Sequence, residues 1–297
     1  MLSSSCANEP GLSGKVDDQL LPISHFDHVP RRYYGRYIAS AVMIAILAYI
    51  VVAFAHGQID WPTVRQFTAS PVILSGLLNT IIMSILAMLL GVVLGIIAAV
   101  MRLSPNPVLR ATAHGYVWLF RGTPVILQLL LWFNLALIFP RLGIPGLFEF
   151  KTVDVITPFL AAFLGLGINQ GAYTSEVVRA GLLAVDSGQY EAAKAIGMPR
   201  FQALRRIILP QALRVIVPPI GNEFIGMVKL TSLASVIQYT EMLHNAENIY
   251  YANQRVIELL IVTGIWYLVV VTVLSAGQSR LEKRLARGFS RRAASKR

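Results

Sequence analysis

The 297-residue sequence contains few charged residues. Asp, Glu, Lys and Arg make up 14% of it, whereas a soluble globular domain carries roughly 25%. Hydrophobic residues reach 55%, and the mean hydropathy is +0.61. The deficit of charge excludes an ordinary soluble fold and indicates a protein embedded in a membrane.

Other chemical features are missing as well. Cys6 is the single cysteine, so the chain can form neither an internal disulfide nor a cysteine-based metal site. The five histidines are scattered and lack the pairing of metal ligands, so we expect no metal chemistry. The first thirty residues lack the apolar core of a secretory signal and are rich in Ser, Asp, Gly and Pro. We expect them to form a disordered cytoplasmic tail.

A nucleotide-binding loop is also absent from the sequence. Residues 11–15, GLSGK, contain a Gly-Lys pair but have neither the spacing nor the Ser or Thr of G-x4-G-K-[ST]. We therefore expect the chain to bind no ATP and to have no enzymatic activity of its own.

Six apolar segments are long enough to be membrane-spanning helices, each of which needs about twenty mostly apolar residues. They are residues 37–55, 72–100, 122–139, 155–173, 215–237 and 256–275. The fourth is expected to continue into a polar helical extension. Pro218 and Pro219 are expected to kink or open the start of the fifth.

The basic residues predict the orientation of these segments. Of the 26 Lys and Arg residues, 21 fall in the N-terminal segment, in 102–121, in 179–214 and in the C-terminal tail. The intervening loops hold only four, and Lys229 lies inside the fifth span. Because basic loops stay in the cytoplasm, both termini are predicted to be cytoplasmic. The net charge of +11 therefore reflects topology. The basic tail has a second interpretation, as a site for nucleic acid or a partner, but we expect it to rest on anionic lipid.

The most informative segment is the polar stretch 191–210, EAAKAIGMPRFQALRRIILP, which lies between two apolar segments. Residues 191–195 are strong helix formers. Gly197 can end that helix in the left-handed conformation, which side chains with a Cβ resist. Pro199 then suits the first turn of a second short helix.

The second half of this stretch predicts an amphipathic helix. Leu204, Ile207 and Ile208 recur at three- and four-residue spacing and form one apolar face. Pro210 is expected to end the element. Without further evidence, the stretch could be a solvated hairpin that has no partner.

The spacing of this stretch resembles the EAA loop of ABC-importer permeases, E-A-A-x3-G-x9-I-x-L-P. The matching residues are Glu191, Ala192, Ala193, Gly197, Ile207, Leu209 and Pro210. Other stretches resemble the polar amino acid branch of the same family. They are FRGTP at 120–124 with Gln128, AY-x2-E-x2-R-x-G at 172–181, GQYEAA at 188–193, PQA-x-R at 210–214, and the PP, NEF and K-x-TSL elements between 218 and 233. The similarity covers about residues 71 to 287.

The resemblance implies an all-α polytopic membrane protein with a five-helix, MetI-like permease core and one extra N-terminal helix. It divides the chain into a polar cytoplasmic tail (1–36), the additional helix (37–55), the permease transmembrane domain (72–277) and a basic cytoplasmic tail (278–297). The coupling loop is 186–213. The implied location is the plasma (inner) membrane of a prokaryote.

The resemblance also implies several partners. In the family, the seven matching loop residues dock onto an ABC ATPase subunit, which binds ATP and Mg, and the glycine is the hinge of the transmitted motion. An extracytoplasmic solute-binding protein delivers the solute. A second permease copy or a sister permease completes the pore, and the lipid bilayer surrounds it. No nucleic acid is expected as a partner.

Polar residues in the fifth span are candidates for the substrate path, because charge within a membrane is costly. Asn222 and Lys229 are seven residues apart and share a helix face, whereas Glu223 does not share it. Asn222, Glu223 and Thr231 could bind the ammonium or hydroxyl groups of an amino acid, and Lys229, beside Thr231 and Ser232, its carboxylate. The alternative is that these residues bond between helices or act in gating.

Other polar residues allow two interpretations each. Glu176 and Arg179 are spaced for an i,i+3 ion pair, which could be an inner gate or could only solubilise the helix. Arg121 is expected to be an interfacial anchor. Asn169 and Gln170 could line the path or bond between helices. Gly91 and Gly95 would allow close helix contact.

Three functions are compatible with these observations. The leading hypothesis is the permease subunit of an ABC importer that moves a polar amino acid by alternating access, driven by its ATPase partner. The alternative is a stand-alone secondary amino-acid transporter, for which inverted repeats would be expected and none is evident. The third is a membrane anchor or signalling scaffold.

Overall fold

The computed structural model describes residues 34–144 and 148–286, and the chain divides into two compact units between Gly57 and Gln58. The described part of the first unit is the helix α1 (Tyr34–Ala55), in which every residue is exposed. The predicted first helix is therefore present and begins three residues earlier than expected. Most of the predicted N-terminal tail and residues 287–297 of the C-terminal tail lie outside the described residues.

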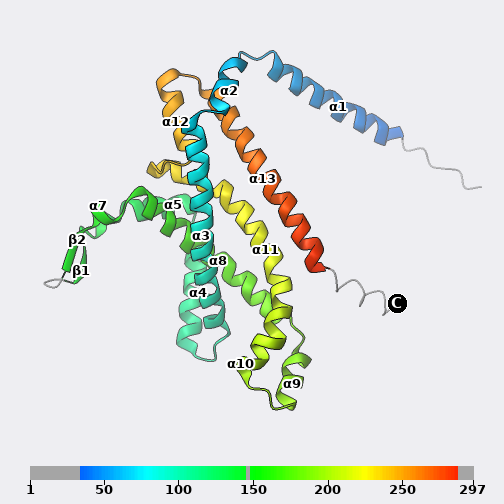
Figure 1. Cartoon of the computed structure of the whole chain (residues 1–297), viewed down its shortest axis with the longest axis vertical. Helices are drawn as coiled ribbons and strands as arrows, with labels where there is room; N and C mark the ends of the chain where they lie inside the picture. Colours follow the sequence, from blue (N-terminus) through cyan, green and yellow to red (C-terminus); the bar gives the residue numbers. More distant parts are fainter. Residues whose placement is uncertain (1–33, 145–147, 287–297) are drawn as a thin grey trace, which may run out of the picture. The chain divides into compact units, whose positions relative to one another are not determined.

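The second unit is mostly helical (Figure 1). Helices α2 and α12 lie at one end of it, the α12 end, and α9 and α10 lie at the opposite end, the α9 end. Its elements are α2 (Trp61–Thr68), α3 (Pro71–Leu103), α4 (Pro107–Gly122), α5 (Val125–Phe133), α6 (Leu135–Ile138), β1 (Arg141–Ile144), β2 (Phe148–Lys151), α7 (Thr152–Val155), α8 (Pro158–Leu183), α9 (Ser187–Ala195), α10 (Arg200–Ala203), the π-helix η2 (Leu204–Ile208), α11 (Leu209–Leu230), the 3-10 helix η3 (Thr231–Ile237), α12 (Met242–Asn253) and α13 (Val256–Ala286).

Four described helices are long and apolar enough to cross a membrane, namely α1, α3, the α10–η3 stretch and α13. The bent pair of α4 and α5 would make a fifth span. Helix α8 has 26 residues, enough for a span, but polar residues such as Asn169 and Gln170 lower its hydropathy. The chain is thus a multi-pass membrane protein, and the number of six spans stays a prediction.

The third predicted span, 122–139, is wrong as a single helix, because α5 ends at Phe133 and α6 begins at Leu135. Its start also differs from prediction. Helix α4 ends at Gly122, and α5 starts at Val125 after a bend of 102°. Pro124 disfavours the helical conformation at the residue before it, and Thr123 is extended, with φ −119° and ψ 145°. The Thr-Pro pair therefore separates α4 from α5.

The other spans differ from prediction mainly at their ends. Helix α8 starts at Pro158, where Thr157 caps it by accepting a hydrogen bond from the Leu160 N–H at 3.2 Å, and its polar extension is confirmed. Pro218 and Pro219 lie in the interior of α11 and not at its start, so the expected opening is wrong and the expected kink stays a prediction. Gln278 of α13 donates a hydrogen bond to the Pro218 carbonyl at 2.8 Å.

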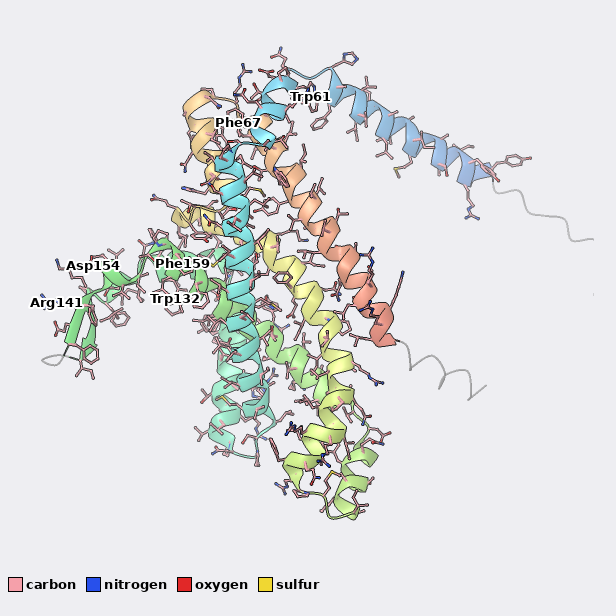
Figure 2. The ribbon with its side chains drawn as sticks, viewed as in Figure 1. Trp61, Phe67, Trp132, Arg141, Asp154 and Phe159 are labelled. Atoms are coloured by element: carbon pink, nitrogen blue, oxygen red, sulfur yellow. The ribbon has the colours of Figure 1, made fainter. Side chains whose placement is uncertain are left out.

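Three buried apolar clusters hold the second unit together. The central one joins α3, α5, α8 and α11 through residues such as Met83, Leu129 and Leu166. The second, at the α12 end, includes Ile73 and Leu259, and Phe67, labelled in Figure 2, packs against it. The third lies near the α9 end and is described with the site.

A short β-hairpin, which the sequence analysis did not predict, precedes α7. Strands β1 and β2 pair antiparallel, with Leu142 opposite Phe150 and Ile144 opposite Phe148. These four side chains share one face, because opposite residues of a ladder point to the same side. The ion pair of Arg141 and Glu149, at 2.8 Å, stands on the other face.

Candidate functional site

The segment 186–213 forms two short helical pieces that meet at Gly197. Gly197 has a φ of +70°. Its N–H donates to the Lys194 carbonyl at 3.0 Å, and the N–H of Met198 donates to the Ala193 carbonyl at 3.0 Å. These two bonds make a Schellman motif, so the predicted left-handed helix end at Gly197 is confirmed.

The second piece differs from prediction. Pro199 stands as the N-cap of α10, one residue before its first turn. Pro210 does not end the element but lies in the first turn of α11. In an α-helix the proline ring presses on the carbonyl four residues earlier. Here the π-helix η2, in which the Leu209 N–H donates to the Leu204 carbonyl, widens the turn just before Pro210.

One side of the segment is anchored and the other is open. Ile208 is fully buried in a cluster with α3 and α8. Ile196 and Phe201 each expose 73% of their surface, and Leu204, part of the predicted apolar face, exposes 42%. Glu191 is exposed and makes no hydrogen bond or ion pair with the described residues. The open side therefore presents apolar side chains beside an unpaired carboxylate.

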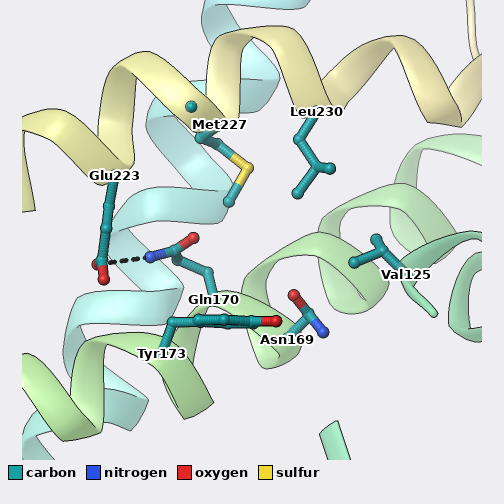
Figure 3. A pocket seen from close by; sticks show the side chains of 8 residues that line it. Val125, Asn169, Gln170, Tyr173, Glu223, Met227 and Leu230 are labelled. Carbon is teal, nitrogen blue, oxygen red and sulfur yellow. Dashed lines mark hydrogen bonds between the residues drawn. The ribbon is translucent and has the colours of Figure 1, made fainter. Parts of the chain in front are cut away.

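A cavity of about 300 Å³ lies between α5, α8 and α11 (Figure 3). Glu223 is the one charged residue in its lining. The lining residues are Val125, Asn169, Gln170, Tyr173, Glu223, Gly226, Met227 and Leu230. A largely apolar cavity with a few converging polar groups is typical of a small-molecule site.

The Glu223 carboxylate is held from α8. Its Oε2 atom accepts hydrogen bonds from Gln170 Nε2 at 2.7 Å and from Thr174 Oγ1 at 3.0 Å, and Figure 3 shows the first of these. No described residue donates to Oε1. The carboxylate is therefore oriented through one oxygen and keeps the other available.

Two glycines of α3 place the donors of Glu223. A Cβ at Gly91 would lie 2.6 Å from Gln170 Cγ, and a Cβ at Gly95 would lie 2.7 Å from Thr174 Cβ. The predicted close contact at Gly91 and Gly95 is thus confirmed, with α8 as the neighbouring helix. It fixes the two side chains that orient the carboxylate.

Asn169 combines both of its predicted roles. It lines the cavity, and its Nδ2 donates to the Phe120 carbonyl at 2.7 Å and to Gln128 Oε1 at 3.2 Å. Gln128 in turn donates to the Thr123 carbonyl at 3.1 Å. These bonds satisfy carbonyls that the break between α4 and α5 leaves without helical partners, so the cavity wall and the bend depend on the same side chains.

The other substrate-path candidates lie outside the cavity lining. Asn222 donates to Glu282 of α13 at 3.3 Å. Thr231 is buried and donates to the Val228 carbonyl at 2.7 Å. Ser232 donates to the carbonyl of Lys229 at 2.8 Å, and Lys229 is itself exposed. A substrate role for these four residues stays a prediction.

Glu176 is the centre of a cluster of charges near the cavity. The predicted pair with Arg179 is confirmed at 3.0 Å. Arg102 of α3 and Arg121 of α4 join it at 2.8 and 3.1 Å. The guanidinium carbon of Arg121 also lies 5.1 Å from the ring centre of Tyr173. Arg121 is thus more than an interfacial anchor, because it links the cluster to a residue of the cavity wall.

Sequence reasoning missed Thr174, Tyr173 and Arg102 in these sites. A signal was available for the first two, since Gln170, Tyr173 and Thr174 are three and four residues apart and share one helix face. Arg102 had no such signal, because its partner lies far along the chain.

The α12 end contains a buried acid that belongs to neither site. Glu241 caps α12 by accepting the His244 N–H at 2.7 Å, and it accepts further hydrogen bonds from Tyr267 and Thr80 at 3.2 and 3.4 Å. Glu241 is fully buried, and this burial raises its pKa to about 7. In the ranges 34–144 and 148–286 no three His, Cys, Asp or Glu side chains come together as a possible metal site.

Comparison with solved structures identifies the fold. The chain is similar to one described as an amino acid ABC transporter with histidines, at a TM-score of 0.67 and 35% identity over 76% of this chain and 99% of that one. It also matches the fold of the MetNI methionine ABC transporter, at a TM-score of 0.59 and 19% identity over 72% of this chain and 96% of that one.

Proteins with similar sequences also indicate an ABC transporter permease. The arginine transport system permease protein ArgU of Corynebacterium glutamicum is 40% identical over 88% of this chain and 84% of its own length. The glutamine transport system permease protein GlnP of Escherichia coli is 33% identical over 77% of this chain and 98% of its own length. The family described as binding-protein-dependent transport system inner membrane component matches residues 91–287. The chain therefore belongs to this family of membrane-embedded permease subunits of ABC importers.

Proposed function

We propose that this permease carries a polar amino acid through the cavity at Glu223. The cavity volume of about 300 Å³ is sufficient for one amino acid. Its single carboxylate, with one oxygen free, suits an ammonium or guanidinium group. Relatives named for arginine and glutamine transport support this class of substrate. The observation that carries the proposal is the orientation of Glu223 by Gln170 and Thr174.

The energy for transport is proposed to come from a separate ATPase that docks on segment 186–213. ATP and Mg would bind to that subunit, since the chain has no G-x4-G-K-[ST] loop. The exposed Ile196 and Phe201 offer apolar anchors of the kind that dominate protein interfaces. The predicted contacts are Glu191, Ala192, Ala193, Gly197, Ile207, Leu209 and Pro210.

The topology completes the proposal. Both termini and segment 186–213 are placed in the cytoplasm on the basis of the Lys and Arg distribution. A solute-binding protein would deliver the amino acid from outside. A second permease, either a copy of this chain or a sister chain, would provide the other half of the pathway.

The cavity is tested by Glu223→Gln. The variant keeps the size of the side chain but removes its charge, so we expect binding of L-arginine, L-histidine and L-lysine to fall by about tenfold or more. Binding is measured by calorimetry on the permease purified with its ATPase. Glu149→Gln, which removes one carboxylate charge from the exposed strand β2 outside the cavity lining, is the control and should leave affinity unchanged. Equal affinity of wild type and Glu223→Gln would exclude this site.

The docking segment is tested by Phe201→Asp and Ile196→Asp. Each places a charge on the proposed interface while leaving the buried Ile208 in place, so the chain should insert normally but lose its ATPase during purification. Phe150→Asp is the matched control, since Phe150 is 58% exposed and lies on β2, outside the predicted spans and away from the segment. Retention of the ATPase by both variants would contradict the docking role.

A further inference from the structure

The cavity described above accounts for a cationic group of the substrate but not for its carboxylate. An amino acid carries both charges, and burying the carboxylate without a partner is costly. Lys229, the candidate from the sequence, is exposed and does not line the cavity. The substrate carboxylate therefore needs a basic partner other than Lys229.

Arg121 is the basic residue in contact with the cavity wall. Its guanidinium stacks over Tyr173 at 5.1 Å, and Tyr173 lines the cavity beside Glu223. A zwitterion bound at Glu223 would therefore have a guanidinium within reach of its opposite end.

The cluster around Glu176 can release Arg121. Three arginines share this one carboxylate, so the cluster carries two positive charges in excess. Arg102 lies 2.8 Å from Glu176 with a side chain only 9% exposed, and Arg179 lies at 3.0 Å. Arg121 is the most exposed of the three, at 42%. If Arg121 turns away, Glu176 keeps two partners.

We propose, on the basis of the function proposed above, that Arg121 leaves Glu176 and binds the carboxylate of the transported amino acid instead. Arginine suits this role, because its planar fork of donors matches a carboxylate in two-point geometry. Substrate binding would then remove one of the ties between α4 and α8. Arg121 is thus a specificity residue that favours amino acids over the corresponding amines.

The proposal is tested with pairs of ligands that differ only in the carboxylate. The pairs are L-arginine with agmatine, L-histidine with histamine, and L-lysine with cadaverine, each titrated into the permease–ATPase complex. For the pair that the wild type binds, we expect a preference for the amino acid of about tenfold or more. Arg121→Gln should abolish this preference by weakening the amino acid while leaving the amine unchanged, and Arg121→Lys should restore part of it.

The matched control is Arg110→Gln, another arginine of α4, which is exposed and has no ion pair among the described residues. It should keep the wild-type preference. A preference that survives Arg121→Gln overturns the carboxylate role but leaves the Glu223 site intact. Equal weakening of amino acid and amine by Arg121→Gln also overturns it, because the residue would then only support the cavity. If the wild type binds no pair, the proposed substrate site itself fails.

Discussion

The two ends of the second unit each hold an acidic side chain, but in different ways. At the α12 end, Glu241 is fully buried and receives hydrogen bonds from neutral groups at fixed positions. Near the α9 end, Glu176 is 27% exposed and pairs with three arginines, two of which are partly exposed. Neutral donors on packed helices make a rigid joint, whereas several interchangeable charges allow one partner to replace another. We therefore propose that the α12 end stabilises the fold and that the charge cluster takes part in movement.

The glycines follow the same division. A Cβ at Gly76, in the α12 end, would lie 2.8 Å from Met242 Cα and 3.0 Å from the Glu241 carbonyl oxygen. A Cβ at Gly197, in the α9 end, would meet nothing within 4 Å. Gly76 is therefore required because a side chain there would overlap its neighbours. Gly197 is required because its positive φ is strained for residues with a Cβ.

The largest effect on stability is expected from Gly76→Val. The added side chain would overlap backbone atoms that cannot move aside, so the variant should lose about 3 kcal/mol of unfolding free energy. The apparent unfolding temperature of the purified chain measures this loss. Gly264→Val is the control, because a Cβ at Gly264 meets nothing within 4 Å. Equal unfolding temperatures for the two variants would contradict the rigid joint.

A comparable but pH-dependent effect is expected from Glu241→Gln. Burial raises the pKa of Glu241 from 4.5 to about 7. The protonated carboxyl therefore contributes stability that is fully present below pH 4.5 and is lost as the pH rises through 7. The neutral glutamine does not lose it, so the variant should be more stable than wild type at pH 8, by about 3 kcal/mol.

The measurement is thermal unfolding at pH 4.5 and pH 8. The difference between variant and wild type should be present at the higher pH and absent at the lower one. Glu149→Gln, which changes an exposed carboxylate on β2, should change stability little at either pH. A pH-independent difference for Glu241→Gln would mean that its charge is not the cause.

The smallest effect on stability is expected from Glu176→Gln. Water partly screens Glu176, Arg121 and Arg179, and only Arg102 is nearly buried, so the variant should lose about 1 kcal/mol. The variant would nevertheless lose the ion pairs that join α3 and α4 to α8. We therefore expect ATP hydrolysis by the complex to rise in the absence of the solute-binding protein. The two measurements are made on one preparation. A stability loss comparable with that of Gly76→Val, or unchanged hydrolysis, would remove the distinction between the two ends.

Local features of the fold and the site could be predicted from the sequence. The turn at Gly197 and the pair of Glu176 and Arg179 depend on residues within one or two helical turns. The break at Thr123-Pro124 was also readable, since proline restricts the residue before it, but the predicted span begins at Gly122 and so includes it.

Features that join distant segments could not be predicted. Arg102 and Arg121 reach Glu176 only because α3 and α4 pack against α8, and a single sequence does not state this pairing. The donors of Glu223 depend likewise on how closely Gly91 and Gly95 let α8 approach. The sequence predicts that Pro210 ends the second short helix, because no local pattern indicates the π-helix that precedes it.

The π-helix Leu204–Ile208 accommodates one extra residue in the chain. A π turn holds about one more residue than an α turn. An extra residue in a continuous α-helix would rotate everything before it by about 100° relative to α11. The wider turn absorbs this rotation within a few residues, so it preserves the direction in which Ile196 and Phe201 point. The spacing of this segment can therefore differ by one residue without misaligning the surface proposed for the ATPase.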